Sequence, residues 1–264
     1  MNIRKFIFYL DIALLLASLA SCLAWLGGKG FFYSEVSAVM SPFTSLSLLL
    51  MSASRLSLKN LTAFPPPLAM AAYGLCIGGN LSSLFIQLMI PDLLLDSLPQ
   101  LVPTSIMTSI GLILFCSYEL LIILRETPES GLIIDDIILH LALVPGGISL
   151  LGHLQGNPYY ISSNLDPRVG ISLLEMGFMG LYACIAALSN TRLFLWTFLK
   201  ESLSNRLVFT VLFINQYIAP VILSFLIYGQ QAHSGLGIEF FVMLAGVMAT
   251  LSFLILQAYR TRLK

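Results

Sequence analysis

The sequence predicts an all-α integral membrane protein of about eight transmembrane helices, arranged as four tandem hairpins. Of its 264 residues, 58% are hydrophobic and 10% are charged, whereas about 25% are charged in ordinary soluble domains. The charged residues fall mainly between apolar stretches that are close to the length needed to cross a bilayer. These stretches are residues 6–26, 37–58, 66–90, 103–124, 131–153, 169–189, 207–228 and 236–259. No segment between them is long enough to form a second, aqueous domain.

The basic residues favour one orientation of these spans. If the N-terminus is cytoplasmic, 11 of the 13 Lys and Arg residues face the cytoplasm, and two, Lys29 and Arg168, lie outside. Loops rich in Lys and Arg stay on the cytoplasmic side of an inner membrane. We therefore expect both termini in the cytoplasm and the 155–168 loop outside. The inside set is Arg4, Lys5, Arg55, Lys59, Arg125, Arg192, Lys200, Arg206, Arg260, Arg262 and Lys264.

Two segments between spans have an amphipathic pattern. Pro91–Leu98 is predicted to form a short turn that lies on the outer membrane surface. Asn190–Asn205 places large apolar residues between Arg192 and Lys200. This second pattern predicts an interfacial helix on the cytoplasmic side, anchored by Trp196.

A short pattern recurs 64 residues apart. Ser41–Leu46 opens the second span and Ser105–Ile110 opens the fourth, each as Ser-x-x-Thr-Ser followed by Leu or Ile. About the same offset leads on to Ser172 and Leu236, near the starts of the sixth and eighth spans. Duplication of a hairpin explains this recurrence, although apolar sequences also align easily with one another. The predicted repeats are residues 1–64, 65–128, 129–192 and 193–264.

Glu175 is predicted to lie about two turns into the sixth span, counted from the outside. An ionisable side chain inside a span is costly, so it should face the bundle interior or a wet cavity. Its role is either structural, as a neutralised or hydrogen-bonded carboxyl group, or functional, as a contact in an outward-facing ligand or ion cavity. Residues expected to share its environment are Ile171, Ser172, Phe178 and Met179.

Asp135, Asp136 and His140 occupy the first turns of the fifth span. Asp136 and His140 are four residues apart and share a helix face, so the carboxylate could orient or charge the imidazole. Alternatively, the two acids at a helix N-terminus simply interact favourably with the helix dipole.

Arg55 and Glu119 lie 64 residues apart, at equivalent positions of two repeats and near the inner ends of their spans. We expect an ion pair between neighbouring hairpins, with snorkelling to the headgroups as the alternative. Asp11 lies at a similar depth in the first span.

Two prolines interrupt predicted spans. Asn215 and Gln216 lie mid-span just before Pro220, where a kink is expected. Pro145, followed by two glycines, is likewise expected to break or bend the fifth span.

Chemical motifs are missing from the sequence. The four cysteines stand singly within apolar runs, and no catalytic, phosphate-binding or haem-binding pattern is present. The sequence therefore predicts no metal site, no cofactor and no enzymatic activity. A net charge of zero argues against nucleic acid as a partner, because phosphate binding needs a basic face.

The second half of the chain carries a set of soft motifs. Leu150–Tyr160 is the end of a leucine-rich helix followed by Gly-His and a Gly-Asn-Pro-Tyr turn, and Ser204–Leu207, Pro220 and Gly235–Gly237 mark the last two helices. In these features the chain resembles the polytopic membrane sensor domains that precede PAS, histidine-kinase or diguanylate-cyclase modules in bacteria. The resemblance implies a location in the bacterial inner membrane.

Three positions bear on that resemblance. Ser41–Leu46 and Ser105–Ile110 approximate the helix start typical of the family, whereas Ile171–Leu174 fits it poorly and Glu175 replaces an apolar residue. Arg260–Lys264 lies where such proteins pass into a cytoplasmic output domain. The resemblance implies either that an output module was removed or that this is a stand-alone membrane subunit.

Together these features predict a non-enzymatic signal-input or anchoring module that acts through a cytoplasmic or membrane partner, with the eighth helix relaying the signal. Expected partners are the lipid bilayer and another protein, either a signalling output module or subunits of a membrane complex. One alternative is a small transporter or channel subunit, with Glu175, Asn215 and Gln216 lining a path. Another is a structural subunit of a larger membrane complex.

Overall fold

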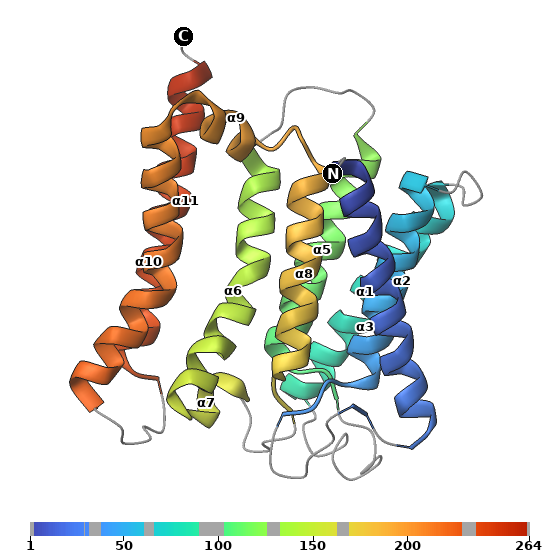
Figure 1. The fold of residues 1–264 in the computed structure, drawn as a ribbon. Helices are drawn as coiled ribbons and strands as arrows, with labels where there is room; N and C mark the ends of the chain where they lie inside the picture. The colour runs from blue at the N-terminus through green and yellow to red at the C-terminus, as the bar shows by residue number, and fades with distance from the viewer. Residues whose placement is uncertain are drawn as a thin grey trace.

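The computed structural model describes residues 3–28, 30–31, 38–60, 66–89, 103–125, 133–162, 169–228 and 236–262. Within these ranges the chain forms helices and no strand, and eight of the helices have 17 residues or more (Figure 1). The predicted all-α membrane class is confirmed, whereas the predicted surface turn at 91–98 lies outside the described residues. The long helices are α1 (Ile3–Leu26), α2 (Pro42–Asn60), α3 (Pro66–Met89), α5 (Ile106–Leu124), α6 (Ile133–Gln155), α8 (Leu173–Ser189), α10 (Leu203–Tyr228) and α11 (Ile238–Arg262).

The number of candidate membrane spans is somewhat below the predicted eight. In the described part of the chain, six helices are long and apolar enough to cross a membrane, or up to seven if α8 and the short α9 (Phe194–Glu201) form one span bent by 71°. Alone, α8 has only 17 residues. α2 is too polar to qualify because its 19 residues include five serines and Arg55. Other helices enclose it, so its polar side chains need not face lipid.

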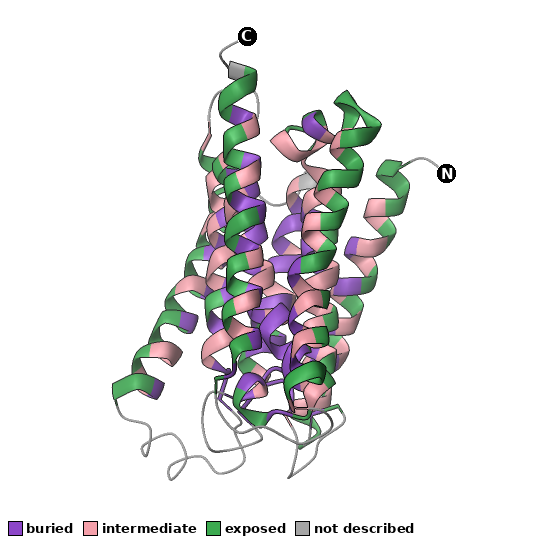
Figure 2. Ribbon diagram, turned by 90° about the vertical axis from the view of Figure 1, so that its left-hand side faces the viewer, coloured by how far each residue is buried: buried purple, intermediate pink, exposed green. Residues whose placement is uncertain are grey.

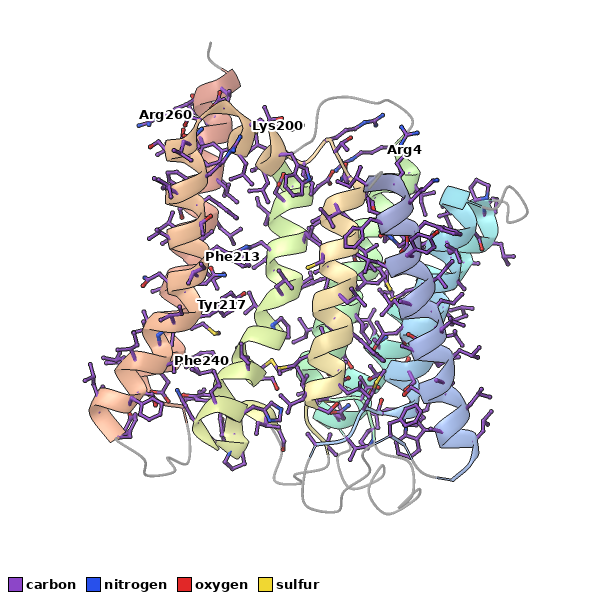
Figure 3. All side chains as sticks on the ribbon, viewed as in Figure 1. Arg4, Lys200, Phe213, Tyr217, Phe240 and Arg260 are labelled. Carbon is purple, nitrogen blue, oxygen red and sulfur yellow. The ribbon has the colours of Figure 1, made fainter. Side chains whose placement is uncertain are left out.

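Both chain ends lie at one end of the bundle, here named the termini end (Figure 1). Three basic residues from different helices, Arg4, Lys200 and Arg260, also lie there (Figure 3). The opposite end of the bundle is named the far end. The long helices run alternately between these two ends, as expected for successive membrane crossings.

The centre of the bundle is formed by α2, α5 and α8, with α1, α3 and α6 packed around them. Figure 2 shows the buried residues gathered inside the bundle. Each central helix contributes a buried side chain to the same two levels, and the corresponding positions are 64 and 67 residues apart. The two levels are Leu48, Leu112 and Met179, and then Met51, Phe115 and Tyr182. This correspondence is compatible with duplication, while the division into four repeats stays a prediction.

Serine residues begin the three central helices at the far end. Ser41, Ser105 and Ser172 each accept a hydrogen bond from the backbone N–H three residues later, at 3.0, 3.0 and 3.2 Å. Such caps satisfy amides that lack a partner within the helix. Because α8 begins at Leu173 rather than at residue 169, Glu175 lies in its first turn. The prediction that Glu175 sits two turns into a span was wrong.

The last two long helices, α10 and α11, form a separate unit, here named the terminal hairpin. They pack on each other and meet the other long helices mainly through α6. α9 joins them at the termini end, where Phe198 is buried with its ring 5.5 Å from that of Phe253. Trp196, predicted to be a membrane anchor, donates from its indole N–H to the Ala187 carbonyl at 2.9 Å. α9 is therefore held by protein contacts as well as by its amphipathic pattern.

The two proline-containing helices are not broken. α6 continues through Pro145 and α10 continues through Pro220. Both change direction part-way along their length in Figure 1, as a proline inside a helix requires. The bends tilt the far-end half of each helix relative to α8.

Candidate functional site

Arg55 of α2 is the largest fully buried side chain of the described residues, and it is 1% exposed. Its Nε donates to Asp11 Oδ1 of α1 at 2.9 Å, and its Nη1 donates to Glu119 Oε1 of α5. Its Nη2 donates to the Ile185 carbonyl of α8 at 3.0 Å and to the Ser189 hydroxyl. One side chain thus joins four helices. The predicted contact between Arg55 and Glu119 is confirmed.

Aromatic side chains complete the surroundings of this guanidinium. Tyr182 lies with its ring centroid 5.8 Å from the Arg55 guanidinium carbon and donates from its hydroxyl to Glu119 Oε1 at 3.2 Å. We name Arg55, Asp11, Glu119, Tyr182 and Ser189 the arginine cluster. A buried guanidinium is tolerated where its donors are all directed at oxygen acceptors. Sequence reasoning found the depth of Asp11 but missed Ser189 and the Ile185 carbonyl, because a backbone acceptor leaves no sequence signal.

A second buried polar group, here named the hydroxyl cluster, lies at the far end among the serine caps. Ser41 and Thr104 share a hydrogen bond of 2.8 Å between their hydroxyl oxygens, as do Ser21 and Ser45. These contacts connect α1 and α2 with the segment that precedes α5. The cluster consists of Ser21, Ser41, Thr44, Ser45, Thr104, Ser105, Thr108, Ser172 and Glu175, which are all buried.

Glu175 is the charged member of the hydroxyl cluster and is 1% exposed. Its Oε2 accepts the Ser172 backbone N–H at 3.4 Å, which completes a reciprocal capping box with the Ser172 hydroxyl. The side chains of Thr44 and Thr108 also lie beside its carboxyl group. Among the described residues, Oε1 has no hydrogen-bond partner. The Ser-x-x-Glu spacing of this capping box was visible in the sequence and was overlooked.

The prediction that Glu175 faces the bundle interior is confirmed. Of the four residues expected to share its environment, Ile171, Ser172 and Met179 are buried, and Phe178 is partly buried against the core. The carboxyl group is enclosed by helix N-termini, whose free amides and positive dipole ends stabilise negative charge. Its surroundings therefore suit an ionised or hydrogen-bonded carboxylate better than lipid would.

An apolar layer separates the two clusters. Thr44 and Arg55 are 11 residues apart on α2, which corresponds to about 16 Å along a helix axis. Between these depths the central helices pack the two levels of large side chains described above, each at most 2% exposed. The rings of Phe115 and Tyr182 contact each other in this layer, with centroids 5.1 Å apart and planes tilted by 60°.

Of the two interpretations of Asp136, the pairing with His140 is not formed. Asp136 instead accepts the backbone N–H groups of Phe194 and Leu195, at 2.9 and 3.0 Å, and so caps α9 from outside that helix. The start of α9 lies beside the start of α6. The first amides of α9 have no partner within their own helix, so they donate to the Asp136 carboxylate. His140 packs edge-on against Phe213 of α10, with ring centroids 5.8 Å apart. Asp135 forms a separate ion pair with Arg125 at 2.6 Å.

Asn215 and Gln216, expected to line one path, face different ways. Gln216 is buried towards α11, where its Oε1 accepts the Thr250 hydroxyl at 3.2 Å. Asn215 is exposed on the outer face of α10. Adjacent residues of a helix point about 100° apart, so the two amides cannot serve one route.

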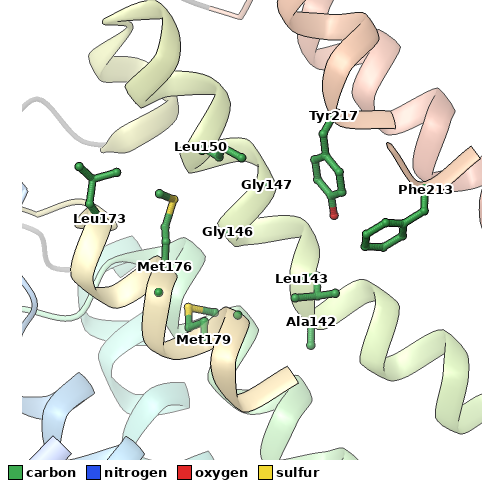
Figure 4. Close-up of a pocket in the computed structure, with 12 residues that line it drawn as sticks. Ala142, Leu143, Gly146, Gly147, Leu150, Leu173, Met176, Met179, Phe213 and Tyr217 are labelled. Atoms are coloured by element: carbon green, nitrogen blue, oxygen red, sulfur yellow. The ribbon is translucent and has the colours of Figure 1, made fainter. Parts of the chain in front are cut away.

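A groove opens between α8 and α10, with α6 as its floor (Figure 4). It has a volume of about 420 Å³ and a predominantly apolar lining. The groove could not be predicted from the sequence, because its lining residues come from three helices that are far apart in the chain. Members that shape it are Gly146, Gly147, Gly177, Gly180, Phe213 and Tyr217.

A polar contact holds the terminal hairpin at the far end. Tyr160 of the short α7 (Pro158–Ile161) donates from its hydroxyl to Glu239 Oε1 of α11 at 2.7 Å and accepts the Gly237 N–H at 2.7 Å. Burial raises the pKa of Tyr160 above its ordinary value, and the neighbouring Glu239 carboxyl raises it further. The hydroxyl therefore keeps its proton and remains a donor to Glu239.

Comparison with known proteins finds no matching family, no matching characterised protein and no matching solved structure. In the described part of the chain, no three His, Cys, Asp or Glu side chains are grouped so as to hold a metal ion. The argument about function therefore rests on the clusters, the groove and the terminal hairpin.

Proposed function

We propose that this protein is a membrane-embedded signal-input or anchoring module, without catalytic activity, that acts through a cytoplasmic or membrane partner. The proposed setting is the inner membrane of a bacterium, with both termini in the cytoplasm. Arg4, Lys200 and Arg260 at the termini end support this orientation (Figure 3).

The groove between α8 and α10 is the observation that carries this proposal. The terminal hairpin meets the other long helices mainly through α6, so it can tilt without breaking the arginine cluster. A Cβ added at Gly177 or Gly180 on the α8 wall would meet no atom within 4 Å. Closer approach of α10 to α8 is therefore sterically open. A module with one packing that keeps the groove open and another that closes it has the two states that signalling requires.

Tilting of the terminal hairpin would be transmitted to the termini end. α11 runs the length of the bundle and ends beside α9, where Tyr259 and Arg260 are exposed. A partner that binds this exposed end would register the tilt directly. The cap that Asp136 places on α9 would couple the same motion to α6.

The alternative function, a transporter or channel subunit, has one observation in its favour. Oε1 of the buried Glu175 has no hydrogen-bond partner among the described residues, as a carboxylate awaiting an ion would. The apolar layer between the hydroxyl and arginine clusters weighs against it, because an ion would have to cross close-packed side chains. Signal input therefore stands as the first proposal.

Two assays on one preparation test this proposal. In mild detergent, we expect a partner to copurify with the wild-type protein and to be lost from Tyr259→Ala, at the exposed end of α11. Leu75→Ala, on the exposed face of α3, is the matched control and should retain the partner. Loss of the partner from Leu75→Ala alone would instead indicate a structural subunit held through α3.

The second assay measures ion flux into proteoliposomes that contain the same protein. We expect no flux of protons, sodium, potassium or chloride above that of empty vesicles. Flux that is present in the wild type and absent in Glu175→Gln would overturn signal input in favour of transport. The glutamine keeps hydrogen bonding at this position while removing the charge.

A further inference from the structure

The outward face of α10 carries a regular stripe of exposed side chains. Counting along the helix, the spacing between them alternates between three and four residues, which is the seven-residue repeat of helices that pack lengthwise on a partner. Val211, Ile218 and Ile222 are 63%, 48% and 54% exposed. The whole stripe is Val208, Val211, Asn215, Ile218, Ile222 and Phe225, and every member is exposed.

This stripe lies on the side of α10 that faces away from the rest of the bundle. Gln216, Pro220 and Ser224 are the buried residues of α10 and define its packed side. With 100° between successive residues, the stripe is centred roughly opposite to that side. α10 forms the outer edge of the molecule in Figure 1, and Figure 2 turns this edge towards the viewer. The stripe is therefore accessible from the membrane.

Asn215 is the polar exception within the stripe, and it lies at the middle of the span. Twelve residues separate it from Leu203, where α10 begins, and 13 separate it from Tyr228, where α10 ends. Its side chain makes no hydrogen bond to the described residues, and a side-chain amide that faces hydrocarbon without a partner is costly. By contrast, the exposed Ser82 of α3 satisfies its hydroxyl on the Gly78 carbonyl of its own helix, at 2.8 Å.

We propose that α10 is a homodimer interface, in which the Asn215 side chains of two copies of this protein hydrogen-bond to each other in the middle of the membrane. Copies inserted in one membrane share an orientation. A two-fold axis along the membrane normal therefore places the same residue of both copies at the same depth. A side-chain amide has both donors and an acceptor, and it is thus complementary to itself.

The side chains on either side of Asn215 also agree with a second copy of this protein as the partner of α10. In parallel helix assemblies, a single Asn within the seven-residue repeat fixes the register of the paired helices. Val208 and Ile222 occupy the positions equivalent to Asn215, one repeat before and one repeat after it. Val208, Val211, Asn215 and Ile218 precede Pro220 and lie on the part of α10 before its bend, so the main contact falls on this half of the helix.

Energy transfer between donor- and acceptor-labelled copies in proteoliposomes tests this interface. The label goes on Tyr259→Cys, with Cys22 and Cys184 replaced by alanine and the buried Cys76 and Cys116 retained. As lipid is added, transfer should fall at a characteristic protein-to-lipid ratio. For Asn215→Leu that ratio should rise about 10-fold, in line with the strength of polar contacts between membrane helices in model peptides.

Two further variants serve as controls in this dilution experiment. Asn215→Gln should stay within about 3-fold of the wild type because it keeps the self-complementary amide. Ser82→Leu makes the same polar-to-leucine change on an exposed face of α3 and should leave the ratio unchanged. If Asn215→Leu and Ser82→Leu give the same ratio as the wild type, Asn215 does not hold a dimer.

Cross-linking in native membranes identifies the protein that packs against the stripe on α10. Val211→Cys and Ile218→Cys should form disulfide-linked dimers of this protein on mild oxidation, whereas Leu75→Cys on α3 should not. Cross-links from Val211→Cys to a different protein, with none between copies of this chain, would overturn the homodimer and assign the stripe to another subunit. Equal cross-linking at Leu75→Cys would show random collision and would also overturn it.

Discussion

The six-helix core, formed by α1, α2, α3, α5, α6 and α8, and the terminal hairpin are held in different ways. In the core, the Arg55 side chain donates to oxygen atoms of three other helices, and close-packed apolar levels separate it from the hydroxyl cluster. In the hairpin, α10 and α11 pack mainly on each other, and most of α10 is exposed. A buried charge network is satisfied in one geometry, whereas the hairpin is held to the core by fewer contacts. We therefore propose a fixed scaffold that carries a movable arm.

The largest effect is expected from Arg55→Ala in the core. This change leaves Asp11 and Glu119 buried without their cation, and breaking a buried ion pair in this way costs about 3–5 kcal/mol. Thermal unfolding in detergent should show a large drop in stability. Arg192→Ala is the control, because Arg192 is exposed and a surface substitution of this kind usually changes stability by no more than about 0.5 kcal/mol. Equal losses for the two variants would contradict a locked core.

A smaller effect, confined to the terminal hairpin, is expected from Gly246→Ala. An added Cβ would come within 2.8 Å of Gln216 Cβ and 2.9 Å of its Cα, so α10 and α11 would have to separate. Overpacking of this kind costs about 1–3 kcal/mol. Hydrogen exchange should become faster in α10 and α11 while the core peptides stay unchanged.

Gly177→Ala provides the counterpart to that change on the core side of the groove. Its added Cβ meets no atom within 4 Å, so we expect unchanged or slightly slower exchange throughout. If Gly177→Ala destabilised the protein as much as Gly246→Ala, α8 and α10 would be in closer contact than the groove allows.

The smallest destabilisation is expected where the core and the hairpin meet, from Asp136→Ala. Removing the carboxylate leaves the Phe194 and Leu195 amides of α9 uncapped, which costs about 0.5–2 kcal/mol for a helix cap. Exchange at the start of α9 should accelerate, with no change at α2 or α5. Glu201→Ala, at the exposed end of the same helix, should have no such effect. Unchanged exchange in Asp136→Ala would remove α9 as the link between the two regions.

The sequence predicted the parts of the site that depend on helix depth. Arg55 and Glu119 could be paired because equal offsets from their helix starts place them at one level, and Glu175 could be placed inside because a carboxylate is costly in lipid. Rotation about the helix axis was harder to predict. Asn215 and Gln216 are neighbours in sequence, yet one faces lipid and the other faces α11.

Contacts to backbone atoms lay beyond sequence reasoning. For Asp136 the sequence offered the imidazole four residues away or the dipole of its own helix, but the carboxylate accepts two amides of α9 that come close only after folding. The same holds for the Ile185 carbonyl at Arg55 and for the groove, whose lining comes from three helices. Nearly every residue has the same backbone N–H donor and C=O acceptor. Only the folded structure determines which of these groups lack a partner within their own helix and can bind a side chain.

The contrast between a fixed core and a movable hairpin is tested most directly by distances between paired spin labels in lipid nanodiscs. One pair joins Leu16 of α1 to Leu75 of α3, both exposed and both in the core; the other joins Leu16 to Leu256, exposed on α11. Dilution with unlabelled protein removes distances between copies. We predict a single narrow distance distribution for the core pair and a broad or two-peaked distribution for the pair that spans the groove. Equally narrow distributions for both pairs would contradict the account, because the hairpin would then be as fixed as the core.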